Sequence, residues 1–212
     1  MINIIDKNNT YISNTVKIGD NCTIYPNVYI EGDTVIGDNT TIYMGSYIKD
    51  SKIGSNNTIF TSYVIGSIIG DNNQVGPYAY IREGNKIGNN NRLGSFVEFK
   101  ENTIGDGNKI PHLSFIGNTT VNNNVHIGCG VITVNKKVNS NAGERENTSI
   151  LDNSFIGCNS NLIAPVTIGE NSVVAAGSTI TNDVPDNSLA IARERQTIKE
   201  NYRWFSFFMD YD

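Results

Sequence analysis

Histidine, cysteine, tryptophan and charged residues are all scarce in this chain of 212 residues. Charged residues make up 17% of it, against roughly a quarter in soluble domains. The three cysteines, Cys22, Cys129 and Cys158, are too few and too widely spaced for a disulfide framework, and they indicate a reducing cytoplasm. No apolar run approaches the roughly 18 residues needed to cross a bilayer, so we expect no membrane partner. The net charge of −5 argues against a nucleic-acid partner, which requires a basic face.

Asparagine and glycine take the place of charge, with 32 and 20 residues respectively. The apolar fraction of 38% is spread evenly along the chain, which argues against disorder. The shortage of Ala, Glu, Lys and Leu excludes a coiled coil or helical bundle. A repeat begins as early as Ile12, so we expect no catalytic domain upstream of it.

An aliphatic residue recurs every six positions, occasionally every five, along most of the chain. The residue that follows it is often Gly and then Asp or Asn, which tolerate tight corners. A period of six fits neither a helix nor a series of hairpins, and it predicts short strands joined by corners. The 28 positions are Ile12, Ile18, Ile24, Ile30, Ile36, Ile42, Ile48, Ile53, Ile59, Val64, Ile69, Val75, Ile81, Ile87, Leu93, Phe99, Ile104, Ile110, Ile116, Val121, Ile127, Thr133, Ile150, Ile156, Leu162, Ile168, Val174 and Ile180.

Three such strands close one coil of about 18 residues, so the repeat predicts about nine coils stacked about 4.8 Å apart. We therefore expect an all-β, single-stranded parallel β-helix over residues 1–183, with a loop leaving its wall at 134–148. Residues 184–212 form a short C-terminal extension that we expect to cap the last coil. Its aromatic residues either take part in that cap or form a patch for a partner or subunit contact; they are Tyr202, Trp204, Phe205, Phe207, Phe208 and Tyr211.

Stacking the coils places one candidate site on the wall of the prism. Residues two positions after successive repeat positions form a vertical file in which His112 precedes three small residues: Cys129, Cys158 and Ala176. Small residues leave a groove in which a thin ligand could lie.

A second column places Arg82 and Lys100 side by side, with Glu98 beside them. Two cations about 5 Å apart repel each other by roughly 1–3 kcal/mol. Either an anion such as phosphate lies between them, or the two side chains splay toward carboxylates such as Glu83 or Glu101.

The only histidines are His112 and His126. A hexapeptide-repeat carbonic anhydrase would need three histidine ligands for zinc, which two cannot supply. His126 with Cys129 lacks further ligands, so we expect no metal site.

Seven stretches between Gly76 and about Lys199 carry a more specific signal: GPYAYIREG, LGSFVEFK, KIPHLSFIGN, HIGCGVITVN, CNSNLIAPVTIG, VAAGSTITNDVP and LAIARERQTIKE. In order and spacing they resemble the C-terminal acetyltransferase domain of bifunctional UDP-N-acetylglucosamine pyrophosphorylase/glucosamine-1-phosphate N-acetyltransferase, of the hexapeptide-repeat family. The resemblance implies a left-handed β-helix, a homotrimer with its cofactor groove between subunits, and acetyl-CoA as acyl donor without a metal.

The same resemblance assigns roles to individual residues. His112 is the catalytic base and Glu98 its carboxylate partner, while Arg82, Lys100 and, in the loop, Arg145 bind the substrate phosphate. Phe115 and His126 lie in the acceptor pocket. The acetyl-CoA positions are Cys129, Asn135, Lys136, Cys158, Ala176 and Arg193.

The chain departs from the family pattern mainly on the acceptor side. Phe115 replaces a tyrosine, His126 replaces an asparagine and Lys136 replaces a tyrosine beside Asn135. We expect an N-acetyltransferase that acts on an amino sugar phosphate or a nucleotide-linked amino sugar. The alternatives are an acyltransferase with another acceptor, such as a hydroxyl, and a non-catalytic sugar-phosphate-binding scaffold. Because the family's nucleotidyltransferase domain has no counterpart here, that activity could come from a separate partner.

Overall fold

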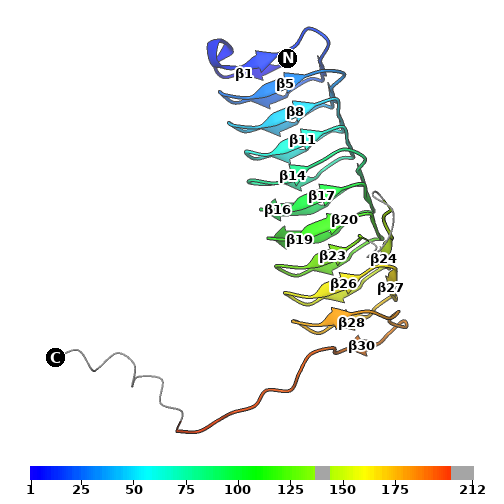
Figure 1. The fold of residues 1–212 in the computed structure, drawn as a ribbon. Coiled ribbons are helices and arrows are strands. Elements are labelled where there is room, and N and C mark those ends of the chain that lie inside the picture. The colour runs from blue at the N-terminus through cyan, green and yellow to red at the C-terminus, as the bar shows by residue number, and fades with distance from the viewer. Residues whose placement is uncertain (137–143, 202–212) are drawn as a thin grey trace, which may run out of the picture.

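The computed structural model describes residues 1–136 and 144–201, which form a prism of short stacked strands (Figure 1). The predicted left-handed parallel β-helix is confirmed, with about ten coils and three sheets as its faces. Every pairing between neighbouring coils is parallel. One 3-10 turn, η1 (Lys7–Asn9), lies within the first coil.

We call the three faces sheets A, B and C. Sheet A contains β1 (Asn3–Ile4), β4 (Thr23–Ile24), β7 (Thr41–Ile42), β10 (Thr58–Ile59), β13 (Gln74–Val75), β16 (Arg92–Ser95), β19 (Lys109–His112), β22 (His126–Ile127), β25 (Phe155–Ile156), β28 (Val173–Val174) and β30 (Leu189–Ala190). Sheet B contains β2 (Tyr11–Ile12), β5 (Tyr29–Glu31), β8 (Tyr47–Lys49), β11 (Tyr63–Ile65), β14 (Tyr80–Ile81), β17 (Glu98–Lys100), β20 (Phe115–Gly117), β23 (Ile132–Val134), β26 (Asn161–Ile163) and β29 (Thr179–Ile180). Sheet C contains β3 (Lys17–Ile18), β6 (Val35–Ile36), β9 (Lys52–Ile53), β12 (Ile68–Ile69), β15 (Lys86–Ile87), β18 (Thr103–Ile104), β21 (Thr119–Val121), β24 (Thr148–Ile150) and β27 (Val166–Ile168).

The aliphatic repeat forms the core. From Ile24 to Ile180 every repeat position is buried, and Ile12 and Ile18 pack partly buried against the first coils. Phe99 is the largest of these buried side chains. Since each inward residue lies above its counterpart in the next coil, the core is one narrow column, stabilised by burial of apolar surface at roughly 25 cal/mol per Å².

Asparagine is abundant because it makes the corners. Twelve of the described asparagines occupy the left-handed region with φ between 54° and 59°: Asn21, Asn27, Asn39, Asn56, Asn72, Asn90, Asn124, Asn153, Asn159, Asn171, Asn187 and Asn201. Asparagine tolerates this conformation better than other residues with a Cβ. A second file is buried, where the side-chain oxygens of Asn57, Asn73 and Asn91 each accept a hydrogen bond from the backbone of the next coil, 2.7–2.8 Å long. These bonds satisfy backbone groups that the corners would leave unpaired.

The stack contains about one coil more than the repeat predicts, because both ends continue past it. Ile4 of β1 pairs with Ile24 before the first recognisable repeat position. At the other end Val184 bridges Ile168, and β30 pairs with β28. Ala192 still bonds to Ser178 and Thr179 of the last coil, and the exposed segment after Arg193 then leaves the prism (Figure 1). The aromatic residues of the predicted cap lie outside the described residues.

The interruption of the repeat does not shift the register. β21 pairs with β24 across it, with Val121 opposite Ile150. Val134 and Thr148 are still strand residues, so the excursion begins at Asn135. Its two ends meet in an antiparallel bridge between Lys136 and Arg145, and the Glu146 N–H donates to the Asn135 carbonyl at 2.9 Å. The loop therefore leaves and re-enters the wall at one point.

A search of the described residues for helices of sufficient length and hydropathy to cross a bilayer finds none.

Candidate functional site

The predicted file of small residues lies on the corner between sheets A and B. The register β19–β22–β25–β28 stacks Ile110, Ile127, Ile156 and Val174, and the file follows two residues after each. His112 ends β19 with its side chain exposed, Cys129 is half-buried and Cys158 is exposed. The corner thus has one imidazole at one end of a strip of small side chains.

Glycines beside this file let the coils approach closely. A Cβ on Gly94 would lie 1.9 Å from the Pro111 carbonyl oxygen, and one on Gly157 would lie 2.4 Å from the Ala176 nitrogen. These contacts are with backbone, which cannot move aside without displacing a strand. Gly94 therefore determines the position of the strand end that carries His112.

Arg82, Glu98 and Lys100 project from sheet B, Glu98 toward this corner and the two cations toward the corner with sheet C. Glu98 lies opposite Tyr80 and Phe115 in the adjacent strands, as the stacking predicts. The Arg82 Nη1 donates to Glu98 Oε1 at 2.9 Å, and its guanidinium lies 5.7 Å from the centre of the Tyr80 ring. Lys100 Nζ lies 3.5 Å from Glu101 Oε1. Each cation therefore has a carboxylate neighbour. Lys100 pairs with Glu101, as the sequence suggests, whereas Arg82 pairs with Glu98 and not with Glu83.

These pairs influence protonation. The hydrogen bond from Arg82 to Glu98 raises the pKa of the Arg82 guanidinium. A hydrogen bond from Asn118, followed by the nearby Lys100, lowers the pKa of the Glu101 carboxyl. Arg82 Nε is one of the two buried side-chain atoms in the described part of the chain that lack a hydrogen-bond partner. The wall thus favours the charged form of the Arg82 guanidinium and leaves its Nε donor without a partner.

The predicted base, His112, and its predicted carboxylate partner, Glu98, are not hydrogen-bonded to each other in the described residues. Glu98 Oε1 is occupied by Arg82. The His112 carbonyl accepts a hydrogen bond from Ser114 Oγ at 2.9 Å, which holds the backbone at this corner.

The two predicted acceptor residues lie on different faces. Phe115 is on β20 of sheet B, in register with Glu98. His126 is half-buried on β22 of sheet A, in register with Lys109, and its ring centre lies 5.1 Å from that of Phe155. Burial, and then the nearby charge of Lys109, lower the pKa of the His126 imidazole. We therefore expect His126 to be neutral near pH 7.

Lys109→Met should raise the pKa of His126, because it removes a cation that disfavours the imidazolium. The pKa should stay below the ordinary value of about 6.5, because burial remains. Since the folded chain binds this proton less readily than the unfolded chain, His126 should lower stability as the pH falls below about 6.5. Titration of the imidazole by NMR, with His112 as internal reference, measures the shift. An unchanged or lower pKa would contradict the assigned role of Lys109.

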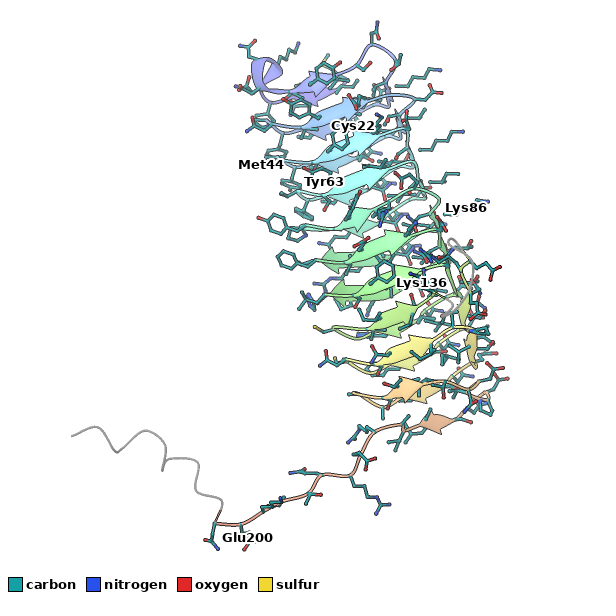
Figure 2. All side chains as sticks on the ribbon, viewed as in Figure 1. Cys22, Met44, Tyr63, Lys86, Lys136 and Glu200 are labelled. Carbon is teal, nitrogen blue, oxygen red and sulfur yellow. The ribbon has the colours of Figure 1, made fainter. Side chains whose placement is uncertain are left out.

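The predicted cofactor residues lie at two corners of the prism: Cys129, Cys158 and Ala176 between sheets A and B, but Asn135 and Lys136 between β23 of sheet B and β24 of sheet C. Asn135, nine-tenths buried, donates through Nδ2 to Asn118 Oδ1 at 2.7 Å. Lys136, labelled in Figure 2, lies at the base of the loop opposite Arg145. Arg193 Cδ would lie 3.7 Å from a Cβ on Gly177, the neighbour of Ala176, so Arg193 lies at the far end of the file.

Asn118 is a residue that the sequence reasoning missed. It donates to Glu101 Oε2 at 2.8 Å and accepts from Asn135, so it connects the carboxylate beside Lys100 to the base of the loop. Its position one coil after Glu101 was a usable signal. In residues 1–136 and 144–201, no three His, Cys, Asp or Glu side chains gather as metal ligands.

Comparisons with known proteins agree with the fold. Residues 6–148 match the family described as GMPPB C-terminal domain, and residues 147–182 match bacterial transferase hexapeptide, six repeats. A UDP-N-acetylglucosamine acyltransferase structure from Francisella novicida superposes with a TM-score of 0.63 at 21% identity, over 91% of this chain and 67% of that one. The corresponding Arabidopsis enzyme superposes with a TM-score of 0.56 at 19% identity, over 90% and 69%.

The fold defines a left-handed β-helix protein of hexapeptide repeats. The chain belongs to the GMPPB C-terminal domain family. Bifunctional protein GlmU of Geobacillus sp. (strain WCH70) is 52% identical over 201 residues, and that of Clostridioides difficile (strain 630) is 50% identical over 202 residues. Both alignments cover 95% of this chain and 43% of the relative, so the chain spans less than half the length of these relatives. The predicted resemblance to the C-terminal acetyltransferase domain is thereby confirmed.

Proposed function

We propose that this protein is a cytoplasmic acetyl-CoA-dependent N-acetyltransferase that acts on an amino sugar phosphate resembling glucosamine 1-phosphate, or on a nucleotide-linked amino sugar. The observation that best supports this proposal is the set of side chains at and beside the corner between sheets A and B. There an exposed histidine begins a strip of small residues, and two cations project from the adjoining face. The relatives named bifunctional protein GlmU support the same activity.

In the proposed reaction the substrate amine attacks the thioester carbonyl carbon, and the coenzyme A thiolate leaves. His112 accepts the proton of the amine, for which an imidazole has a suitable pKa near neutral pH. Glu98 orients that imidazole through the carboxylate oxygen that Arg82 does not use, since the Arg82 bond engages Oε1. A backbone N–H near Cys129 or Cys158 is the candidate oxyanion donor.

Arg82 and Lys100 hold the phosphate and so position the amine. Phosphate oxygens can compete for them because the existing ion pairs are partly exposed, at 28–47% of the side-chain surface, and such pairs contribute little. Acetyl-CoA lies along the file from Cys129 to Ala176. Arg193 lies beside its far end. Asn135 and Lys136, with Arg145 next to Lys136, lie across sheet B at the corner with sheet C.

We further propose a homotrimer with this corner between subunits. Exposed aromatic rings lie beside this corner in the coils that precede His112: Tyr11, Tyr29, Tyr63 and Tyr80 on strands of sheet B, and Tyr78 and Phe96 at the corner itself. An exposed apolar strip of this length is typical of a protein interface. Light scattering that finds an active monomer would contradict the trimer.

Lys100→Met should raise the KM for a phosphate-bearing acceptor by roughly tenfold to a hundredfold, the value of a charge-assisted hydrogen bond. The KM for acetyl-CoA should stay nearly unchanged. Lys17→Met is the matched control, because Lys17 is exposed on β3 at the N-terminal end of sheet C, several coils from β17. Equal effects of the two substitutions would contradict the role of Lys100.

A panel of acceptors with release of free coenzyme A as readout tests the proposed function. Release with glucosamine 1-phosphate or a related amino sugar supports it. Release only with a hydroxyl acceptor would show that the protein is an acyltransferase with a different acceptor. Phe115 and His126, which depart from the family pattern in the acceptor pocket, would explain that change of specificity. Absence of acetyl-CoA binding in calorimetry would favour a non-catalytic sugar-phosphate-binding scaffold. If acetyl transfer is found, addition of a separate nucleotidyltransferase tests whether that enzyme uses the acetylated sugar phosphate as its substrate.

A further inference from the structure

Two of the three cysteines occupy successive coils at one corner. We infer that Cys129 and Cys158 form a vicinal thiol pair that small disulfides, such as oxidised glutathione, convert reversibly to an intrachain disulfide. The pair is in register because Ile127 lies opposite Ile156, and each cysteine follows two residues later. The Asn159 N–H also donates to the Cys129 carbonyl at 2.7 Å, so the backbones remain bonded at the cysteines themselves.

The geometry suits a bridge. In-register residues of adjacent parallel strands have Cα atoms about 4.8 Å apart, within the range of about 4.4–6.8 Å seen for disulfides. Cys158 Sγ lies 3.0 Å from the position that a Cβ of Gly128 would occupy. The Cys158 thiol is therefore turned toward the preceding coil, and Gly128 has no side chain to separate it from Cys129.

Accessibility distinguishes this pair from the third cysteine. Cys158 is exposed and Cys129 half-buried, so a small disulfide can reach them. Cys22 is buried near the N-terminal end of the prism (Figure 2), and its thiol lies 3.1 Å from the Gly37 carbonyl oxygen. Burial raises the pKa of the Cys22 thiol, which lowers the fraction of reactive thiolate.

The chemistry is thiol–disulfide exchange in two steps. The Cys158 thiolate attacks one sulfur of oxidised glutathione, which forms a mixed disulfide and releases one glutathione. The Cys129 thiolate then attacks Cys158 Sγ and releases the second glutathione. Two protein thiols are oxidised, and their two electrons and two protons reduce one glutathione disulfide to two thiols. Excess reduced thiol reverses both steps.

The bridge would act directly on the strip between His112 and Ala176. This consequence rests on the proposed function, since Cys129 and Cys158 lie where the acyl donor is proposed to bind. A disulfide would turn both sulfur atoms toward each other and change the surface of the groove. We expect acetyl transfer to fall by about tenfold or more, because small displacements of a bound reactant have large effects on rate.

The first experiment identifies the bridge without any activity assay. The full chain is incubated with oxidised glutathione, and peptide mapping under non-reducing conditions locates the cross-link. A Cys129–Cys158 peptide pair from the monomeric chain, retained in Cys22→Ser and lost in Cys158→Ser, supports the proposal. A stable adduct of phenylarsine oxide, a reagent that binds two neighbouring thiols, should follow the same pattern. Absence of the intrachain bridge, or a bridge that involves Cys22 or joins two chains, would overturn it.

The second experiment compares activity before and after oxidation. Loss of activity in the wild type and in Cys22→Ser, reversed by dithiothreitol and absent in Cys158→Ser, supports control of the groove by the pair. A bridge that leaves activity unchanged would overturn that control. A bridge in a protein that is inactive even when reduced would contradict the proposed function but leave the thiol pair standing, so the two failures are distinguishable.

Discussion

His112→Ala should lower the rate of acetyl transfer by at least about a hundredfold, the lower range of general-base catalysis. Without the imidazole the attacking amine must lose its proton to water, and the barrier rises. The side chain is exposed at the end of β19 and outside the apolar core, so its removal should not affect folding. The measurement is kcat with saturating acetyl-CoA, alongside circular dichroism and thermal unfolding.

The pH profile distinguishes a base from a structural residue. The wild type should lose activity as the pH falls through the pKa of the base, whereas the residual activity of His112→Ala should lack that step. His126→Asn is the matched control, because it removes the other histidine of the chain but not the proposed base. Full activity of His112→Ala would refute the assignment.

Phe99→Ala should destabilise the protein by roughly 3–5 kcal/mol, as truncation of a buried phenylalanine usually does. Phe99 is fully buried and has the largest side chain of the core. It also separates Glu98 from Lys100 on β17, so its cavity lies directly beneath the wall of the site. Urea unfolding followed by circular dichroism measures the loss, and the KM for the acceptor measures the local effect.

Ile30→Ala provides the comparison for this effect. Ile30 is equally buried but lies in β5, several coils from the site. Because each coil of a solenoid contacts only its neighbours, the damage should remain local. Both variants should be less stable, but only Phe99→Ala should raise the KM. A raised KM in Ile30→Ala would show that the coils are more strongly coupled than this architecture implies.

Much of the fold could be predicted from spacing alone. A period of six places one residue of each repeat inside the prism, and burial from Ile24 to Ile180 confirms that prediction. The same spacing correctly places Glu98 opposite Phe115, and Ile150 above Val121 after the loop. The spacing did not predict the first and last coils, because Ile4 and Ala190 occur where the repeat is incomplete.

The catalytic and binding roles of the site residues stay predictions, because they depend on ligands and on side-chain directions that spacing does not determine. Arg82 illustrates the difference. The repeat places it next to Lys100, but its side chain turns toward Glu98 and Tyr80. Glu98 is therefore shared between a phosphate-binding candidate and the base that it is expected to orient.

The sequence by itself determined the backbone of this protein: a parallel β-helix, its register and the column to which each residue belongs. It could do so because every coil repeats the same local interactions, and a regular repeat has one compatible stacking. Only the tertiary structure decided which neighbours pair, including Arg82 with Glu98, Asn118 between Glu101 and Asn135, and the turn of Cys158 toward Gly128. Several partners lie within reach of each outward side chain, and the choice among them depends on rotamers, burial and competing hydrogen bonds that appear only when the coils are stacked.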